Sequence, residues 1–175
     1  PNSVIKRMFD YISNGMLKWA DMGEVYDRII IGDKSYDLVK GVSNFKSKLL
    51  DYFPDEGKAI EEYVNLVFAA NKASRKFYMA KAMPNLVSNL IGGMMRKPYY
   101  KYSDKTTYEV LSSLTENEEL IKVLAGQYGD YGLPPKQSSF AMHASVARHY
   151  FSGGNFPIGG SSQIVKTIDP VIEAA

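Results

Sequence analysis

The residues best suited to hold a cofactor are a pair of glycines followed by two serines: Gly159, Gly160, Ser161 and Ser162. A run of helical spacing follows them, so backbone amides and the positive end of a helix dipole could face an anion there. Glycine also lets a flat ring approach the backbone closely, because it has no Cβ. On spacing alone, however, an ordinary turn is the more common reason for such a pair.

Motifs of self-sufficient nucleotide enzymes and of hydrolases are absent from the sequence. It contains no G-x-G-x-x-G after a strand, no G-x-x-x-x-G-K-[ST] and no G-x-S-x-G. The absence of cysteine excludes disulfides, cysteine-ligated zinc and thiol nucleophiles. His143 and His149 are six residues apart, which places them on different sides of a helix. We therefore expect no metal site.

The most unusual local composition lies in residues 83–102, where apolar residues at helical spacing run into lysines, an arginine and tyrosines. Such a helix suits the headgroup boundary of a bilayer. Its methionines would also pack adaptably around an irregular apolar ligand. Burial in the protein core is the plain alternative. Stacking of single-stranded nucleic acid on the tyrosines is the weakest interpretation, because the overall charge is balanced.

Length and charge narrow the class of protein. A chain of 175 residues can bury a core of its own without metal or disulfides. Its 21 basic and 19 acidic residues give a net charge of +2, which does not indicate a nucleic-acid partner. The sequence starts without a secretory signal and has no apolar run of about 20 residues. We expect a cytoplasmic protein, with peripheral contact to a membrane left open.

Hydrophobic periodicity predicts an α+β fold, mostly helical with a small antiparallel hairpin. The strands are expected at 25–31 and 35–39, around a turn at Gly32 and Asp33. Thr115 and Glu118 have the spacing of a helix capping box. The remaining apolar stripes predict helices over 3–20, 44–53, 55–83, a stretch after Pro84, 104–114, 140–151 and a stretch from 162.

Three segments together carry a family resemblance. They are 126–144 (GQYGDYGLPPKQSSFAMHA), 149–164 (HYFSGGNFPIGGSSQI) and 168–172 (IDPVI). They resemble blocks of the FAD-dependent oxidoreductase family that includes phytoene desaturases, carotenoid isomerases and retinol saturases. A looser similarity, including YFPDE at 52–56 and IEEY at 60–63, extends it over nearly the whole chain.

The resemblance implies that residues 1–175 are one substrate-side domain of a larger flavoprotein whose FAD-binding domain lies outside this chain. The parent would bind FAD and desaturate, saturate or isomerise a polyene, an isoprenoid or a related apolar substrate. This chain alone would be inactive and would bind no cofactor. By analogy with the superfamily, Gly159, Gly160 and Ser161 would pass close to the flavin, which favours the close-approach interpretation over the simple turn.

The resemblance also makes residues 83–102 a candidate wall or mouth of an apolar tunnel. It implies substrate contacts for Phe140, His143, Tyr150, Leu90 and Met94. His143 and Tyr150 are the candidates for proton donors, although packing explains both. A sheet cut from its neighbours would leave an open strand edge and invite homodimer pairing. The alternative function is a helical lipid-binding or protein-interaction module without catalytic activity.

Overall fold

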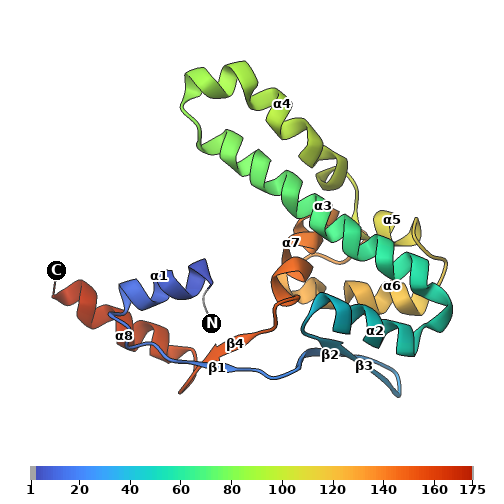
Figure 1. Ribbon diagram of the computed structural model, residues 1–175, viewed down its shortest axis with the longest axis horizontal. Coiled ribbons are helices and arrows are strands. Elements are labelled where there is room, and N and C mark those ends of the chain that lie inside the picture. Colours follow the sequence, from blue (N-terminus) through green and yellow to red (C-terminus); the bar gives the residue numbers. More distant parts are fainter. Residues whose placement is uncertain (1–2, 175) are drawn as a thin grey trace. The chain divides into compact units, whose positions relative to one another are not determined.

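The computed structural model describes residues 3–174, which form two compact units (Figure 1). The first unit combines the residues up to Glu24 with those from Gly153 onward, and the second spans Val25–Ser152. Within residues 3–174 there are two antiparallel sheets of two strands each, and most other residues are helical. The predicted α+β class is confirmed.

The first unit joins two helices and two short strands from opposite ends of the sequence. Its strands pair antiparallel, with Trp19 opposite Pro157. Neither of its helices contains a buried residue. The four elements are α1 (Val4–Ile12), β1 (Trp19–Asp21), β4 (Asn155–Pro157) and α8 (Ser162–Glu173).

The helix predicted over residues 3–20 is wrong in its second half, because α1 ends at Ile12. Asn14 and Gly15 adopt positive φ values of 47° and 72°, which a right-handed helix does not contain. The Ser13 hydroxyl donates to the carbonyl of Phe9 at 2.6 Å and helps to end the helix. Residues beyond the turn form β1, whose partner lies far away in the sequence.

The second unit contains the predicted hairpin and the main helices. The strands β2 (Val25–Ile31) and β3 (Lys34–Val39) pair in register from Ile31 opposite Lys34. These strands and the main helices confirm the elements predicted from hydrophobic periodicity. The helices are α2 (Val42–Tyr52), η1 (Pro54–Glu56), α3 (Gly57–Ala82), α4 (Asn85–Ser103), α5 (Thr107–Ser112), α6 (Glu118–Ala125), η2 (Gly126–Asp130) and α7 (Phe140–Tyr150).

The core of the second unit lies around the first half of α3. This helix contacts α2, α4 and α7, and α5 packs on both α6 and α7. The apolar residues of α3 recur at three- and four-residue spacing, so one face of α3 is buried against α2, α4 and α7. The hairpin adds Tyr36 and Leu38 to the same core. The buried residues of α3 include Ile60, Tyr63, Val64 and Val67, and those of α7 include Phe140, Ala144 and Ala147.

Residues 83–102 contribute no buried side chain to this core, and only Tyr102 among them is a partly buried apolar residue packed against it. Within α4, which the structure describes in full, Gly92 is the one buried residue. The helix also continues through Pro98 to Ser103 as a single element. The alternative that this apolar helix is simply buried is therefore wrong.

The capping box lies at the start of α5, and its prediction at Thr115 is wrong. The Thr106 hydroxyl accepts from the amide of Glu109 at 3.2 Å, and the Thr106 amide donates to the Glu109 carboxylate at 2.7 Å. The bonds from Thr106 hold the pKa of Glu109 below its usual value. Asn117 caps α6 instead, because the Thr115 hydroxyl donates to Glu56 at 2.7 Å.

We expect the substitution Thr106→Ala to lower the free energy of unfolding by about 1 kcal/mol, because it removes the side-chain half of the box. Ser112→Ala is the matched control at the other end of α5, where the hydroxyl bonds only to preceding carbonyls. Urea unfolding measures both. Equal losses in the two variants would contradict the assignment of the cap.

Candidate functional site

His143 lies at the centre of a buried chain of polar side chains in the second unit. It projects from α7 and is 1% exposed. Its Nε2 lies 3.0 Å from the hydroxyl of Tyr63 on α3, and its Nδ1 lies 3.1 Å from the hydroxyl of Tyr131. Ser139 positions this part of α7, since its side chain caps the helix at Ala141. Both ring nitrogens of His143 therefore have a partner.

The chain continues beyond the half-buried Tyr131 to two buried side chains, Ser138 and Thr107. The Tyr131 hydroxyl interacts with the hydroxyls of Ser138 and Thr107. Those two hydroxyls are 2.9 Å apart, and the Thr107 amide donates to the Ser138 carbonyl at 2.8 Å. Hydrogen bonds thus connect α3, α7, the segment before α7 and the start of α5.

Burial keeps this chain uncharged at neutral pH. It lowers the pKa of His143 from 6.5 to about 4. It raises the pKa of Tyr63 well above its usual value, and it raises that of Tyr131 against the opposing effect of Ser138 and Thr107. A neutral imidazole donates through one nitrogen and accepts through the other, and a phenol can do either. The arrangement can hold or pass a proton but places no acid or base at the surface.

The predicted substrate residues fall into separate places in the second unit. Phe140 is fully buried beside His143, with ring centroids 5.7 Å apart. Leu90 and Met94 form part of an exposed stripe on α4 instead. The structure therefore brings Phe140 and His143 together and leaves the two α4 residues apart from the polar chain.

Tyr150 is the predicted residue that reaches a surface hollow. Its ring stacks on Tyr26, with centroids 5.4 Å apart and planes at 13°. Partial burial and a hydrogen bond to Asp130 raise its pKa. The open hollow has a volume of about 390 Å³ and is lined by Asp130, Ser145, Val146, His149 and Tyr150.

The predicted cofactor residues form the turn before α8 in the first unit. Gly159 and Gly160 have φ values of 91° and 92°, where a side chain is strained. A Cβ on Gly159 would lie 3.1 Å from Gln163, whereas beside Gly160 there is open space. Ser161 stands at the N-cap of α8 without a side-chain cap bond. An exposed, Cβ-free backbone at a helix start fits the edge of a flat ring or an anion.

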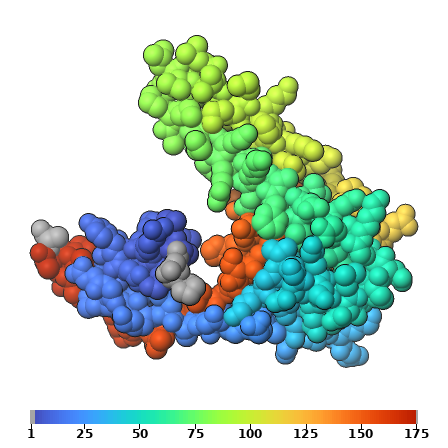
Figure 2. Space-filling view, viewed as in Figure 1, coloured from blue at the N-terminus to red at the C-terminus, as the bar shows by residue number. Residues whose placement is uncertain are grey.

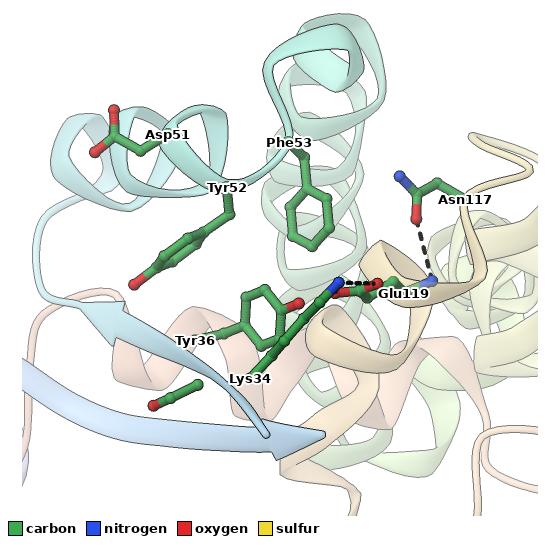
Figure 3. Close-up of a pocket in the computed structure, with 8 residues that line it drawn as sticks. Lys34, Tyr36, Asp51, Tyr52, Phe53, Asn117 and Glu119 are labelled. Atoms are coloured by element: carbon green, nitrogen blue, oxygen red, sulfur yellow. Dashed lines mark hydrogen bonds and ion pairs between the residues drawn. The ribbon is translucent and has the colours of Figure 1, made fainter. Parts of the chain in front are cut away.

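A second hollow, of about 540 Å³, was not predicted from the sequence (Figure 3). Tyr36 of β3 stacks on Phe53 there, with ring centroids 5.6 Å apart. The Lys34 ammonium donates to the Glu119 carboxylate at 2.8 Å across one side. Its lining combines residues 34–36 and 51–53 with Asn117 and Glu119, which meet only after folding, so no local pattern signals this open site.

Two other kinds of site are not found in residues 3–174. No group of three or more histidine, aspartate or glutamate side chains is arranged to hold a metal ion there. Nor is any helix in that part of the chain both long and apolar enough to span a membrane.

Comparison with known proteins finds relatives along nearly the whole chain. An all-trans-retinol 13,14-reductase of Homo sapiens is 32% identical over 181 residues, covering 99% of this chain. The enzyme of that name in Danio rerio is 30% identical over 179 residues, covering 98% of the chain. The resemblance to the retinol saturase-like family is confirmed.

This chain spans about 30% of the length of each of these relatives. A Danio rerio protein named inactive all-trans-retinol 13,14-reductase is similar to the same degree, at 31% over 180 residues. No family model and no solved structure matches the chain. Similarity of this degree is therefore shared by relatives named as reductases and by one named as inactive.

We expect His143 to make stability depend on pH between about 4 and 6.5. In that interval the unfolded chain binds a proton that the folded chain does not, so the free energy of unfolding falls as the pH is lowered. Above pH 6.5 none of this stability is lost. Once the pH has fallen below about 4, the loss in the free energy of unfolding amounts to about 3 kcal/mol. Urea unfolding at pH 7 and pH 4.5 measures it.

His143→Gln should remove most of this dependence, whereas His149→Gln, on the exposed side of the same helix, should leave it unchanged. All three proteins are compared at the same two pH values, so the difference between the variants isolates His143. The same pH dependence in the wild type and in His143→Gln would show that His143 is not held neutral by burial.

Proposed function

We propose that this chain is the substrate-side part of a flavin-dependent oxidoreductase that reduces a double bond of a retinoid-like isoprenoid. The observation that carries the proposal is the similarity along 98–99% of the chain to proteins named all-trans-retinol 13,14-reductase. Saturation of a double bond takes up a hydride and a proton. The flavin, when bound and in its reduced form, would supply the hydride, while the protein orients the substrate and excludes water.

In this proposal Gly159, Gly160 and Ser161 lie against the FAD. This placement is supported by the positive φ values of both glycines, by the open space beside Gly160 and by the helix that starts after Ser161. The FAD-binding domain itself would lie outside residues 1–175, so this chain alone would neither bind FAD nor catalyse the reaction. The absence of buried residues in α1 and α8 supports packing against that further part.

We propose different roles for the substrate residues of α7. Tyr150 lines a hollow and would contact the substrate directly. Phe140 and His143 are buried and do not line that hollow, so they would hold α7 in place. The apolar substrate would be taken from a membrane that the protein contacts peripherally. Homodimer pairing through the hairpin edge and a cytoplasmic location remain predictions.

The proposal is tested with the full-length protein that contains this chain. We expect an absorbance spectrum of bound oxidised flavin after purification, and reduction of all-trans-retinol when the flavin is reduced. The chain of residues 1–175 alone should show no flavin. A folded full-length protein that is colourless and does not take up added FAD would contradict the proposal and favour the helical lipid-binding module.

We expect Gly160→Ala in the full-length protein to weaken FAD binding roughly tenfold, which corresponds to about 1.4 kcal/mol. Its new methyl group would stand where the ring approaches. Gly23→Ala is the matched control, since Gly23 has a φ of 90° and equally open surroundings in the same unit. Titration with FAD measures both variants. Equal affinities would show that Gly160 does not face the cofactor.

A further inference from the structure

Basic residues are concentrated in one segment of the sequence. Residues 63–103, between Glu62 and Asp104, contain seven lysines and arginines and no acidic residue. The chain as a whole has a net charge of +2, so the rest of it carries −5. The seven cations are Lys72, Arg75, Lys76, Lys81, Arg96, Lys97 and Lys101.

This segment forms a helical hairpin made of α4 and most of α3. In the second unit the hairpin extends beyond α5, α6 and α7 (Figures 1 and 2). The Phe77 and Tyr99 rings pack with centroids 4.3 Å apart, and the Ser88 hydroxyl donates to the Ala80 carbonyl at 3.0 Å. A Cβ on Gly92 would lie 2.8 Å from the hydroxyl of Ser88, one turn earlier in α4, so glycine leaves that hydroxyl free to bond to α3. The hairpin therefore has a defined surface.

An apolar stripe runs along the outside of the hairpin. Leu86, Leu90 and Met94 follow one another at four-residue spacing on α4, and their exposed fractions are 77%, 80% and 76%. They therefore share one face of the helix and are turned away from α3. Tyr78 and Met79 on α3 are also exposed. A contiguous apolar surface of this kind indicates a contact with another molecule or with a membrane.

Most cations of the hairpin are available to a partner, although Arg96 donates to the Ser88 hydroxyl at 3.3 Å. Within residues 3–174 none of the seven forms an ion pair with a carboxylate. Lys81 and Lys101 lie over the rings of Phe77 and Tyr102, at 5.8 and 5.6 Å from the ring centroids. Long cationic side chains beside apolar residues can keep their charged ends at the level of lipid phosphates.

We propose that the α3–α4 hairpin docks on the surface of an anionic phospholipid bilayer. The stripe of Leu86, Leu90 and Met94 enters the boundary between headgroups and acyl chains, and the cations contact the phosphates. A charge of a single sign over 41 residues complements such a surface. A folded protein partner would more commonly present charges of both signs, and a nucleic acid would leave the apolar stripe in water.

This inference rests on the proposed function in one respect: docking would let an apolar substrate enter the protein from the membrane. The docking itself depends on the hairpin surface and can be measured without flavin or retinoid. Its failure is therefore distinguishable from that of the oxidoreductase proposal, which is decided by the spectrum of the full-length protein.

The test is flotation of the 175-residue chain with vesicles of phosphatidylcholine, with and without phosphatidylserine. We expect binding to the vesicles that contain phosphatidylserine, and a roughly tenfold weaker affinity in high salt, which screens the cations. Equal binding to both kinds of vesicle would overturn the electrostatic contribution. Binding to neither, or binding to single-stranded RNA in place of vesicles, would overturn the proposal.

Paired variants separate the two parts of the surface. Leu90→Ser with Met94→Ser should weaken vesicle binding roughly tenfold, while Ile30→Ser, which changes a 70% exposed residue of β2, should not. Lys76→Glu with Lys97→Glu should weaken it similarly, while Lys122→Glu on α6 should not. All altered side chains are exposed, and circular dichroism checks the fold. Equal effects of hairpin and control variants would overturn the assignment to the hairpin.

Discussion

The second unit depends on the burial of one face of α3. That helix contacts α2, α4 and α7, and its first half supplies much of the apolar core. The same helix supplies Tyr63 to the buried histidine and then leaves the core as one arm of the basic hairpin. Loss of the buried face would therefore disturb the polar chain and the exposed surface together, although the two lie at different parts of α3.

The polar chain around His143 is tolerated inside the core because each ring nitrogen has a partner. A buried polar group without a partner costs stability, whereas a fully bonded network specifies one arrangement of the elements around it. Here the network connects a core helix to the irregular segment that contains Tyr131 and Ser138. This explains how a stretch rich in glycine, proline and tyrosine is held next to α7.

Local pattern was sufficient for the elements that have a strong period. The hairpin of β2 and β3, the helix α3 and the helix α7 agree with the sequence, because burial alternates along them in the expected way. The end of α1 was missed because residues 13–15 override an apolar stripe with a left-handed turn. The capping box of Thr106 and Glu109 has local spacing and was open to prediction, whereas the assignment to Thr115 failed because its partner, Glu56, is 59 residues away. His143 was a candidate, but Tyr63, 80 residues earlier, could not be linked to it from spacing.

The pairing of β1 with β4 has a topological consequence. Trp19 lies opposite Pro157 and Asp21 opposite Asn155, so the strand that leads into Val25–Ser152 runs beside the strand that leads out of it. The second unit is therefore inserted in the sequence between two paired strands, β1 and β4. An insertion of this kind can be lengthened, shortened or exchanged while the polypeptide on either side keeps its path, as in domains inserted into a host protein. Variation in the hairpin or the hollows could accumulate there without disturbing what lies beyond the paired strands.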